Sequence, residues 1–141
     1  MMEEARGLCY EGVHCVLTVR KYPPTVIVLR ISGCDIGEFG AAPMRALSES
    51  VTEANPVDLF IDARDVSGAS IEVSGEWAAW LCRHRGRLRS VTMLTGSRFI
   101  EITAQFVRRF ASLEGIMRIG NDSTMTGTGR PDLLIFYWYL N

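Results

Sequence analysis

Two aspartates and three serines gather in one short stretch, residues 61–77, which reads IDARDVSGASIEVSGEW. An apolar run ends at Asp62 and Asp65, and a bend of small residues then leads into a segment that contains Trp77. A serine here could be a nucleophile, a phosphate acceptor or the cap of a helix, and the aspartates could hold a metal ion. These chemistries predict different functions.

A serine nucleophile needs a general base, and the common hydrolase elbow reads G-x-S-x-G. The segments GASIE and EVSGE each supply only one of the two glycines. The two histidines, His14 and His84, are not placed beside a serine by anything in the sequence. We therefore expect no catalytic serine and no enzymatic activity.

Metal or cofactor binding is also disfavoured. Asp62 and Asp65 are three positions apart, which puts their side chains on opposite faces of a strand, so we expect Asp65 to order the bend by hydrogen bonds with Ser67 or Ser70. The four cysteines are too widely spaced for a zinc site. The glycines of ISGCDIGEFG lack the G-x-G-x-x-G spacing of a dinucleotide loop and are interpreted as turn glycines. We expect free thiols, no metal and no cofactor.

A second cluster of charged residues is basic. The segment RHRGRLR contains Arg83, Arg85 and Arg87 and follows the apolar segment around Trp77. Arginines at the C-terminal end of a helix are stabilised by the helix dipole, which is a structural reason for the cluster. The same side chains could bind an anion or an acidic surface. Both interpretations stay open.

Composition points to a single globular α/β domain that spans residues 1–141. The chain is 48% hydrophobic and 22% charged, with a net charge of -1, which excludes a disordered chain and a non-specific nucleic-acid binder. No apolar run reaches the roughly 18 residues that a membrane span needs, and MMEEARGLCYEG lacks the basic region of a secretory signal. We expect a cytoplasmic protein.

The first half of the chain predicts a hairpin, a helix and a strand. Residues 13–19 and 25–31 are β-rich runs on either side of a Tyr-Pro-Pro turn, and Gly33 is expected to end the second strand. Residues 37–54 have helical spacing, with Pro43 at the start of the regular helix. The near-continuous apolar run VDLFIDA is typical of a strand covered on both faces.

The second half continues as helix, strand, helix and strand. The helix around Trp77 is followed by the strands SVTML and GIMRI, with SRFIEITAQFVRRFASL as a helix between them. In that helix four large apolar residues recur every three or four positions, and we expect them to face the core: Phe99, Ile102, Phe106 and Phe110. The order ββαβαβαβ predicts a mixed sheet with helices packed on it.

Residues 121–141 form an atypical C-terminal extension. GNDSTMTGTGRPD has the composition of a loop, and the final LLIFYWYLN could be a helix or a strand. Its apolar residues need cover, so we expect them to close the core or to form a contact in a homo-oligomer.

Taken together, VIVLRISG, LFIDARDVSGAS, WLCRHRGRLRSVTMLTGSRFIEITAQF and GIMRIG resemble the STAS-like, or SpoIIAA-like, family over about residues 13–120. The resemblance implies an α/β fold with a mixed sheet of four or five strands and helices mainly on one face. It also implies a bacterial binding and regulatory module. In the phosphorylated members an acceptor serine opens an S-S-G or S-x-G segment at a helix N-terminus. Here Val73 would occupy the acceptor position, so the neighbouring Ser74 is the candidate phosphoacceptor.

These observations predict a non-enzymatic regulatory module that binds another protein through the 65–77 bend and the helix that follows. The residues predicted to touch the partner are Asp65, Ser67, Ser70, Ser74 and Trp77. The alternative is a small-molecule or lipid carrier with an apolar pocket between the sheet and the helices. No specific nucleic acid is expected.

Overall fold

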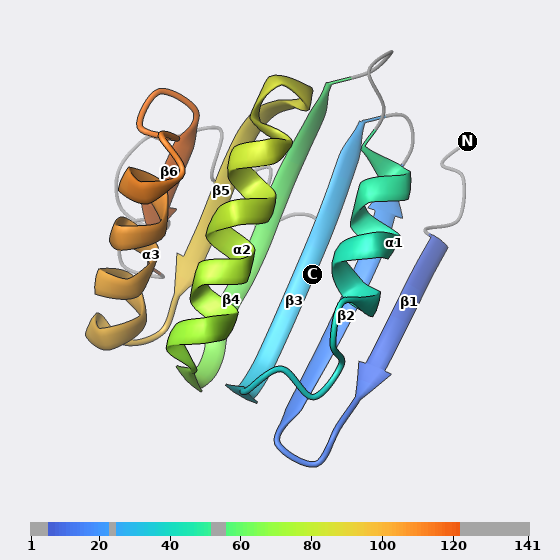
Figure 1. Ribbon diagram of the computed structural model, residues 1–141, viewed down its shortest axis with the longest axis vertical. Coiled ribbons are helices and arrows are strands. Elements are labelled where there is room, and N and C mark those ends of the chain that lie inside the picture. Colours follow the sequence, from blue (N-terminus) through green and yellow to red (C-terminus); the bar gives the residue numbers. More distant parts are fainter. Residues whose placement is uncertain (1–5, 23–24, 52–55, 122–141) are drawn as a thin grey trace.

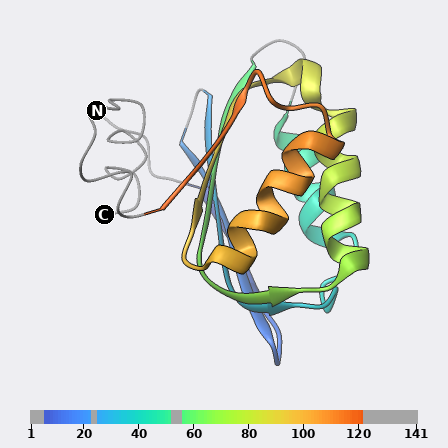
Figure 2. The same cartoon turned by 90° about the vertical axis from the view of Figure 1, so that its left-hand side faces the viewer.

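The computed structural model describes residues 6–22, 25–51 and 56–121. In this part of the chain, three α-helices cover one face of a six-stranded sheet with the strand order β1-β2-β3-β4-β5-β6 (Figures 1 and 2). The strands are β1 (Arg6–Glu11), β2 (Cys15–Tyr22), β3 (Val26–Asp35), β4 (Val57–Ala69), β5 (Leu88–Thr95) and β6 (Met117–Gly120). The helices are α1 (Ala42–Ser50), α2 (Ile71–Arg83) and α3 (Arg98–Phe110), with a short 3-10 turn, η1 (Arg85–Arg87), after α2. The α/β class and the one-sided helices are confirmed, and the sheet is larger than expected because β1 was not predicted.

The sheet is mixed, as its sequence pattern predicts. β1, β2 and β3 are antiparallel neighbours, whereas β3 to β6 run parallel. The pairing of β2 with β3 confirms the predicted hairpin. Helices between parallel strands all run back in the same direction, so the N-termini of α1, α2 and α3 lie near the carboxyl ends of β3, β4 and β5 (Figure 1). This is the lower edge of the sheet in Figure 1.

The prediction that Gly33 ends its strand is wrong. β3 continues to Asp35, and Gly33 has a φ of 85° at a register shift between β3 and β4. Glycine adopts this left-handed conformation without strain, so the strand bulges there instead of stopping. A Cβ on Gly33 would also lie 2.2 Å from the carbonyl oxygen of His14, so this close approach requires glycine.

The main core lies between the sheet and the helices. Trp80 of α2, Leu47 of α1 and Leu59 of β4 are each at most 1% exposed there. β4 is covered on both faces, as VDLFIDA predicts, because Phe60 and Asp62 are buried on the face away from the helices as well. α1 begins beside Pro43, which lies in its first turn as expected.

The predicted core face of α3 is wrong. The side chains that α3 buries are Ile100, Ala104 and Val107, followed by Ala111 just after the helix. The four large residues expected in the core are instead exposed: Phe99, Ile102, Phe106 and Phe110. Both sets have helical spacing. Because the buried set includes two alanines, the helix can approach the strands closely.

The C-terminal extension beyond Asn121 lies outside the described residues, so neither its predicted secondary structure nor its predicted contact is tested. In the part of the chain that is described, no helix is long and apolar enough to cross a membrane.

Candidate functional site

The serine-rich bend is more regular than its composition suggests. β4 runs through Asp65 and Ser67 to Ala69, and both of these polar residues are exposed on the strand. Asp65 makes no side-chain hydrogen bond within the described residues, so the expected bonding to Ser67 or Ser70 is not formed. The prediction that Asp65 orders a turn is wrong, because the backbone at Asp65 belongs to β4 and is paired with β3.

Ser70 is the N-cap of α2. Its hydroxyl oxygen accepts a hydrogen bond from the backbone N–H of Val73 at 3.2 Å, and its own N–H donates to the Asp35 carbonyl oxygen at 3.0 Å. A cap of this kind satisfies one of the backbone donors that a helix N-terminus leaves unpaired. Ser70 therefore joins the end of β3 to the start of α2.

Ser74 lies one turn further into the helix. Its backbone N–H already donates to the Ser70 carbonyl oxygen at 3.0 Å. The half-buried residue helps to line an apolar cavity of about 90 Å³ beneath α2 and α3, together with Trp77. Ser74 lies in the second turn of α2, whereas the free backbone N–H groups that bind a phosphate at a helix N-terminus belong to the first turn. Phosphorylation of Ser74 stays a prediction.

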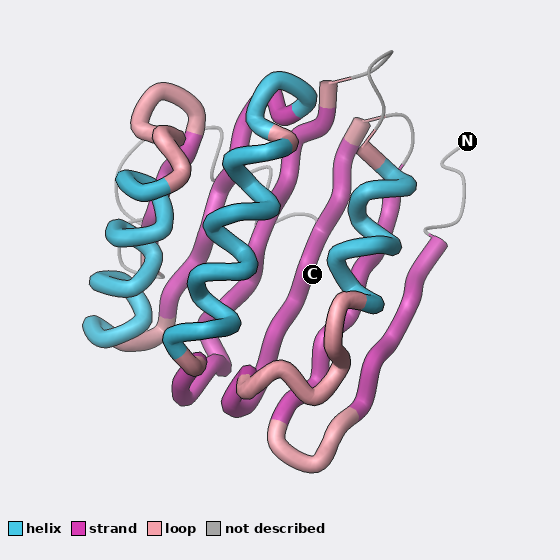
Figure 3. Tube along the Cα trace, in the orientation of Figure 1, coloured by secondary structure: helices cyan, strands magenta, loops and turns pink. Residues whose placement is uncertain are grey.

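Three exposed apolar residues surround this end of the fold. Val13 in the β1–β2 turn and Ile71 at the start of α2 are both 88% exposed, and Ile36 in the β3–α1 connection is 50% exposed. The β1–β2 turn, the β3–α1 connection and the start of α2 all lie at the lower edge of the sheet in Figure 3. The Glu38 carboxylate accepts hydrogen bonds from the N–H groups of Val13 and His14, at 2.8 Å each, which ties the hairpin turn to the β3–α1 connection. We call Val13, Ile36, Ile71 and the 65–77 bend the lower-edge surface.

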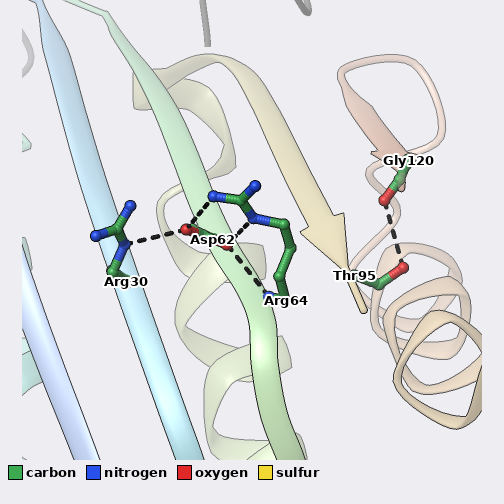
Figure 4. Close-up of polar contacts among 5 residues, drawn as sticks. All are labelled: Arg30, Asp62, Arg64, Thr95 and Gly120. Carbon is green, nitrogen blue, oxygen red and sulfur yellow. Dashed lines mark hydrogen bonds and ion pairs between the residues drawn. The ribbon is translucent and has the colours of Figure 1, made fainter. Parts of the chain in front are cut away.

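The Asp62 carboxylate accepts hydrogen bonds from two arginines. It lies on the face of the sheet opposite the helices, where Arg30 and Arg64 each donate from Nε at 3.0 Å (Figure 4). Burial alone would raise the pKa of Asp62, but the hydrogen bonds and charges of Arg64 and Arg30 outweigh it and lower the pKa below its usual range. A carboxylate held in this way is neither a poised base nor an open metal ligand. No group of three potential metal ligands occurs in the described ranges.

Two further polar contacts hold the sheet together. Asp58 accepts hydrogen bonds from Arg89 and Ser90, and these outweigh the effect of burial and lower the pKa of Asp58. The Thr95 hydroxyl donates to the Gly120 carbonyl oxygen at 3.3 Å, which fastens β6 to β5 (Figure 4). Asp58 and Thr95 therefore have structural roles in the sheet and do not indicate a binding site.

The sequence did not predict that a serine and a histidine meet in α1 and α2. Trp80 donates from Nε1 to the Ser48 Oγ at 2.9 Å, and the His84 Nε2 lies 3.4 Å from the same oxygen. The His84 Nδ1 lies 2.8 Å from the Trp80 carbonyl oxygen, and its ring stacks on Trp80. This network lies toward the C-terminal ends of both helices, where the dipole disfavours an oxyanion. Its geometry suits a polar link between helices more than a nucleophile and base.

The basic cluster lies at the opposite end of α2 from Ser70. Arg83 is the last residue of the helix and is exposed, as is Arg85 in η1, whereas Arg87 is half-buried. The arrangement fits the helix-dipole interpretation. It separates these arginines from the lower-edge surface, so the two predicted binding regions do not form one site.

The four cysteines are free, as expected. Cys9 and Cys82 are exposed, Cys34 is half-buried and Cys15 is buried.

Comparison with known proteins finds similarity to solved structures and to no family model or curated protein. Among solved structures, the chain is similar to an uncharacterised protein of the DUF3478 family from Shewanella loihica PV-4, described as having a SpoIIAA-like fold. The match covers 90% of this chain and 97% of that protein, with a TM-score of 0.57 and 14% identity. This chain has a SpoIIAA-like fold. The expected fold is thereby confirmed, while the likeness carries no statement about activity.

Proposed function

We propose that this SpoIIAA-like domain is a non-enzymatic regulatory module of the bacterial cytoplasm that binds another protein through the lower-edge surface and α2. The observation that carries the proposal is a pair of apolar side chains that are each 88% exposed: Val13 in the β1–β2 turn and Ile71 at the first position of α2. Exposed apolar residues on a rigid edge are typical of interaction sites. In open sheets with parallel strands, ligands also bind outside the carboxyl ends of the strands, which is the edge used here.

The polar neighbours of these residues support the same surface. Asp65 and Ser67 are exposed at the end of β4 and can supply hydrogen bonds at the rim of an apolar contact. Ser70 holds the start of α2 against β3, so Ile71 is presented by an ordered backbone. A preorganised surface loses less conformational entropy when it binds a partner.

Photo-crosslinking in cells of the source organism tests this proposal. A photoreactive amino acid at Ile71 should capture a specific protein, whereas the same group at exposed Glu49, in the last turn of α1, should not. The captured protein, purified, should bind the domain at least about tenfold more weakly after Ile71→Asp. Equal capture from both positions, or unchanged binding by the variant, would refute the proposed surface.

A small apolar ligand is the second candidate, and the cavity beneath α2 and α3 is the observation that favours it. The lining is almost wholly apolar, and includes Ile61, Met93 and Trp77. Its volume of about 90 Å³ is well below the roughly 300–1,000 Å³ of typical ligand pockets. A lipid would require α2 and α3 to separate. Native mass spectrometry after gentle purification distinguishes the two candidates, because a carrier retains the mass of its ligand.

A further inference from the structure

The outer face of α3 carries an apolar stripe that the fold does not use. Its members are 57–66% exposed: Phe99 (65%), Ile102 (57%), Phe106 (60%) and Phe110 (66%). We call these four residues the α3 stripe. The rings of Phe106 and Phe110 stack with their centroids 5.7 Å apart, so part of the stripe is already ordered. α3 thus has two apolar faces, of which the core buries only one.

The size of the stripe indicates the size of its partner. A phenylalanine that is about two-thirds exposed presents on the order of 100 Å² of apolar surface, so the stripe amounts to roughly 400 Å². A standard protein interface takes about 800 Å² from each partner. The stripe is therefore too small to be a whole domain interface and is large enough for the apolar face of a single docked element.

The neighbouring side of α2 extends this apolar surface. α2 and α3 lie side by side, and Leu81 and Thr103 from the two helices line the same cavity (Figure 1). At about 100° per residue, the exposed positions of α2 next to that cavity are apolar or small: Ile71, Gly75 and Cys82. The acidic Glu76 lies on the other side of α2, next to α1. Small residues on α2 beside large ones on α3 form a surface into which a third helix can pack.

The exposed charged side chains of α3 are positive, and the acidic Glu101 in its first turn is half-buried. Arg98 and Arg109 are exposed and eleven positions apart, which is about three helical turns, so they fall on the same flank of α3. Neither has a carboxylate partner within the described residues. A partner with acidic side chains along that border would pair with both.

The same charges argue against a second copy of this chain. If two copies packed their α3 stripes together in antiparallel orientation about a two-fold axis, Arg98 would lie beside Arg109 of the second copy, and this repulsion would occur twice. A membrane surface is the alternative occupant of the stripe, and binding to anionic vesicles tests it. The observations favour a helix with acidic borders.

We propose that the α3 stripe and the adjoining side of α2 bind an amphipathic helix of another protein, with the apolar face of that helix bordered by acidic residues. Helix-in-groove recognition uses apolar anchors at helical spacing in this way. The inference goes beyond the proposed function: the two surfaces share the start of α2, but the α3 stripe itself lies outside the lower-edge surface and binding there is measured separately.

A displayed library of amphipathic helices of about 18 residues tests the proposal with the whole chain as target. Every member carries the same apolar face, and the bordering positions vary among Glu, Gln and Lys. Selection should enrich Glu at the borders, and the selected helices should bind at least about tenfold more weakly after Phe106→Ser. Val13→Ser, which removes an even more exposed apolar side chain elsewhere, should bind them normally.

Charge reversal provides the second measurement. The double variant Arg98→Glu/Arg109→Glu should bind the acidic helices more weakly and should favour Lys-bordered ones. Arg20→Glu, at an exposed position of β2, should change the binding of neither kind of helix. Circular dichroism confirms that each variant remains folded. Any of four results would overturn the proposal: no enriched helix, enrichment of neutral or basic borders, self-association that Phe106→Ser abolishes, or binding to anionic vesicles that Phe106→Ser abolishes. Photo-crosslinking from Val13, which belongs to the lower-edge surface alone, tests the proposed function independently of the stripe, so one can fail without the other.

Discussion

The cap formed by Ser70 predicts how the three serines of the bend differ. In Ser70→Ala the N–H of Val73 loses the hydroxyl that accepts its hydrogen bond, and losing an N-cap of this kind costs about 1 kcal/mol of folding free energy. For a chain of 141 residues, unfolding entropy scales so that 1 kcal/mol lowers the melting temperature by about 3 °C. Ser70→Gly should cost only a few tenths of a kcal/mol, because the backbone N–H becomes accessible to water.

Urea titration monitored by circular dichroism measures these differences, and two variants serve as controls. Ser67→Ala changes an exposed strand residue with no cap and should stay within about 0.5 kcal/mol of the wild type. Ser70→Asp should retain the stability, because a carboxylate also accepts the bond and is favoured by the helix dipole. If Ser70→Ala unfolds like the wild type, or if Ser70→Asp is as unstable as Ser70→Ala, Ser70 is not the cap described here.

Three further predictions concern Asp62, Gly96 and Cys15. Since the pKa of Asp62 is lowered in the folded protein, the ionised carboxylate stabilises the fold above the unfolded pKa of about 3.9, and this stabilisation is lost as the pH falls below that value. Asp62→Asn should therefore lower the free energy of unfolding by about 2 kcal/mol at pH 7. A loss of stability that does not shrink toward pH 3 in urea titrations would contradict this. Gly96→Ala would place a Cβ 2.0 Å from the Arg64 carbonyl oxygen, so it should cost about 1–3 kcal/mol, and thermal melting at the wild-type temperature would show this packing to be wrong. Burial, with the charges of nearby carboxylates, raises the pKa of Cys15 to about 11, so a thiol reagent at pH 8 should label Cys9 rapidly and Cys15 only on unfolding; equal rates would disprove its burial.

The sequence predicted the elements whose signals are local. Pro43 at a helix start and the apolar run of β4 each depend on a few adjacent residues, and the structure has both. The N-cap was predicted as one role for the serines, but spacing alone did not distinguish Ser70 from Ser74. That distinction depends on where β4 ends, which the pairing of β4 with β3 decides.

The face of α3 could not be predicted by the size of its residues. Ala104 and Phe106 belong to two stripes with nearly the same period, and the larger one was assigned to the core. The smaller stripe is buried because α3 lies close to the sheet. A helix with two apolar stripes is itself the signal for a second contact, and this signal is present in the sequence. The link between Ser48 and His84 gave no signal, since it depends on how α1 and α2 are placed together.

Hydrogen exchange of the domain, free and bound to the protein captured from Ile71, tests the central claim most directly. The claim is that binding uses the lower-edge surface and requires no reactive group. Binding should slow exchange in the 65–77 bend and in the β3–α1 connection, residues 36–41, while η1 exchanges as before. Protection confined to η1, or a bound partner that the domain converts chemically, would contradict it.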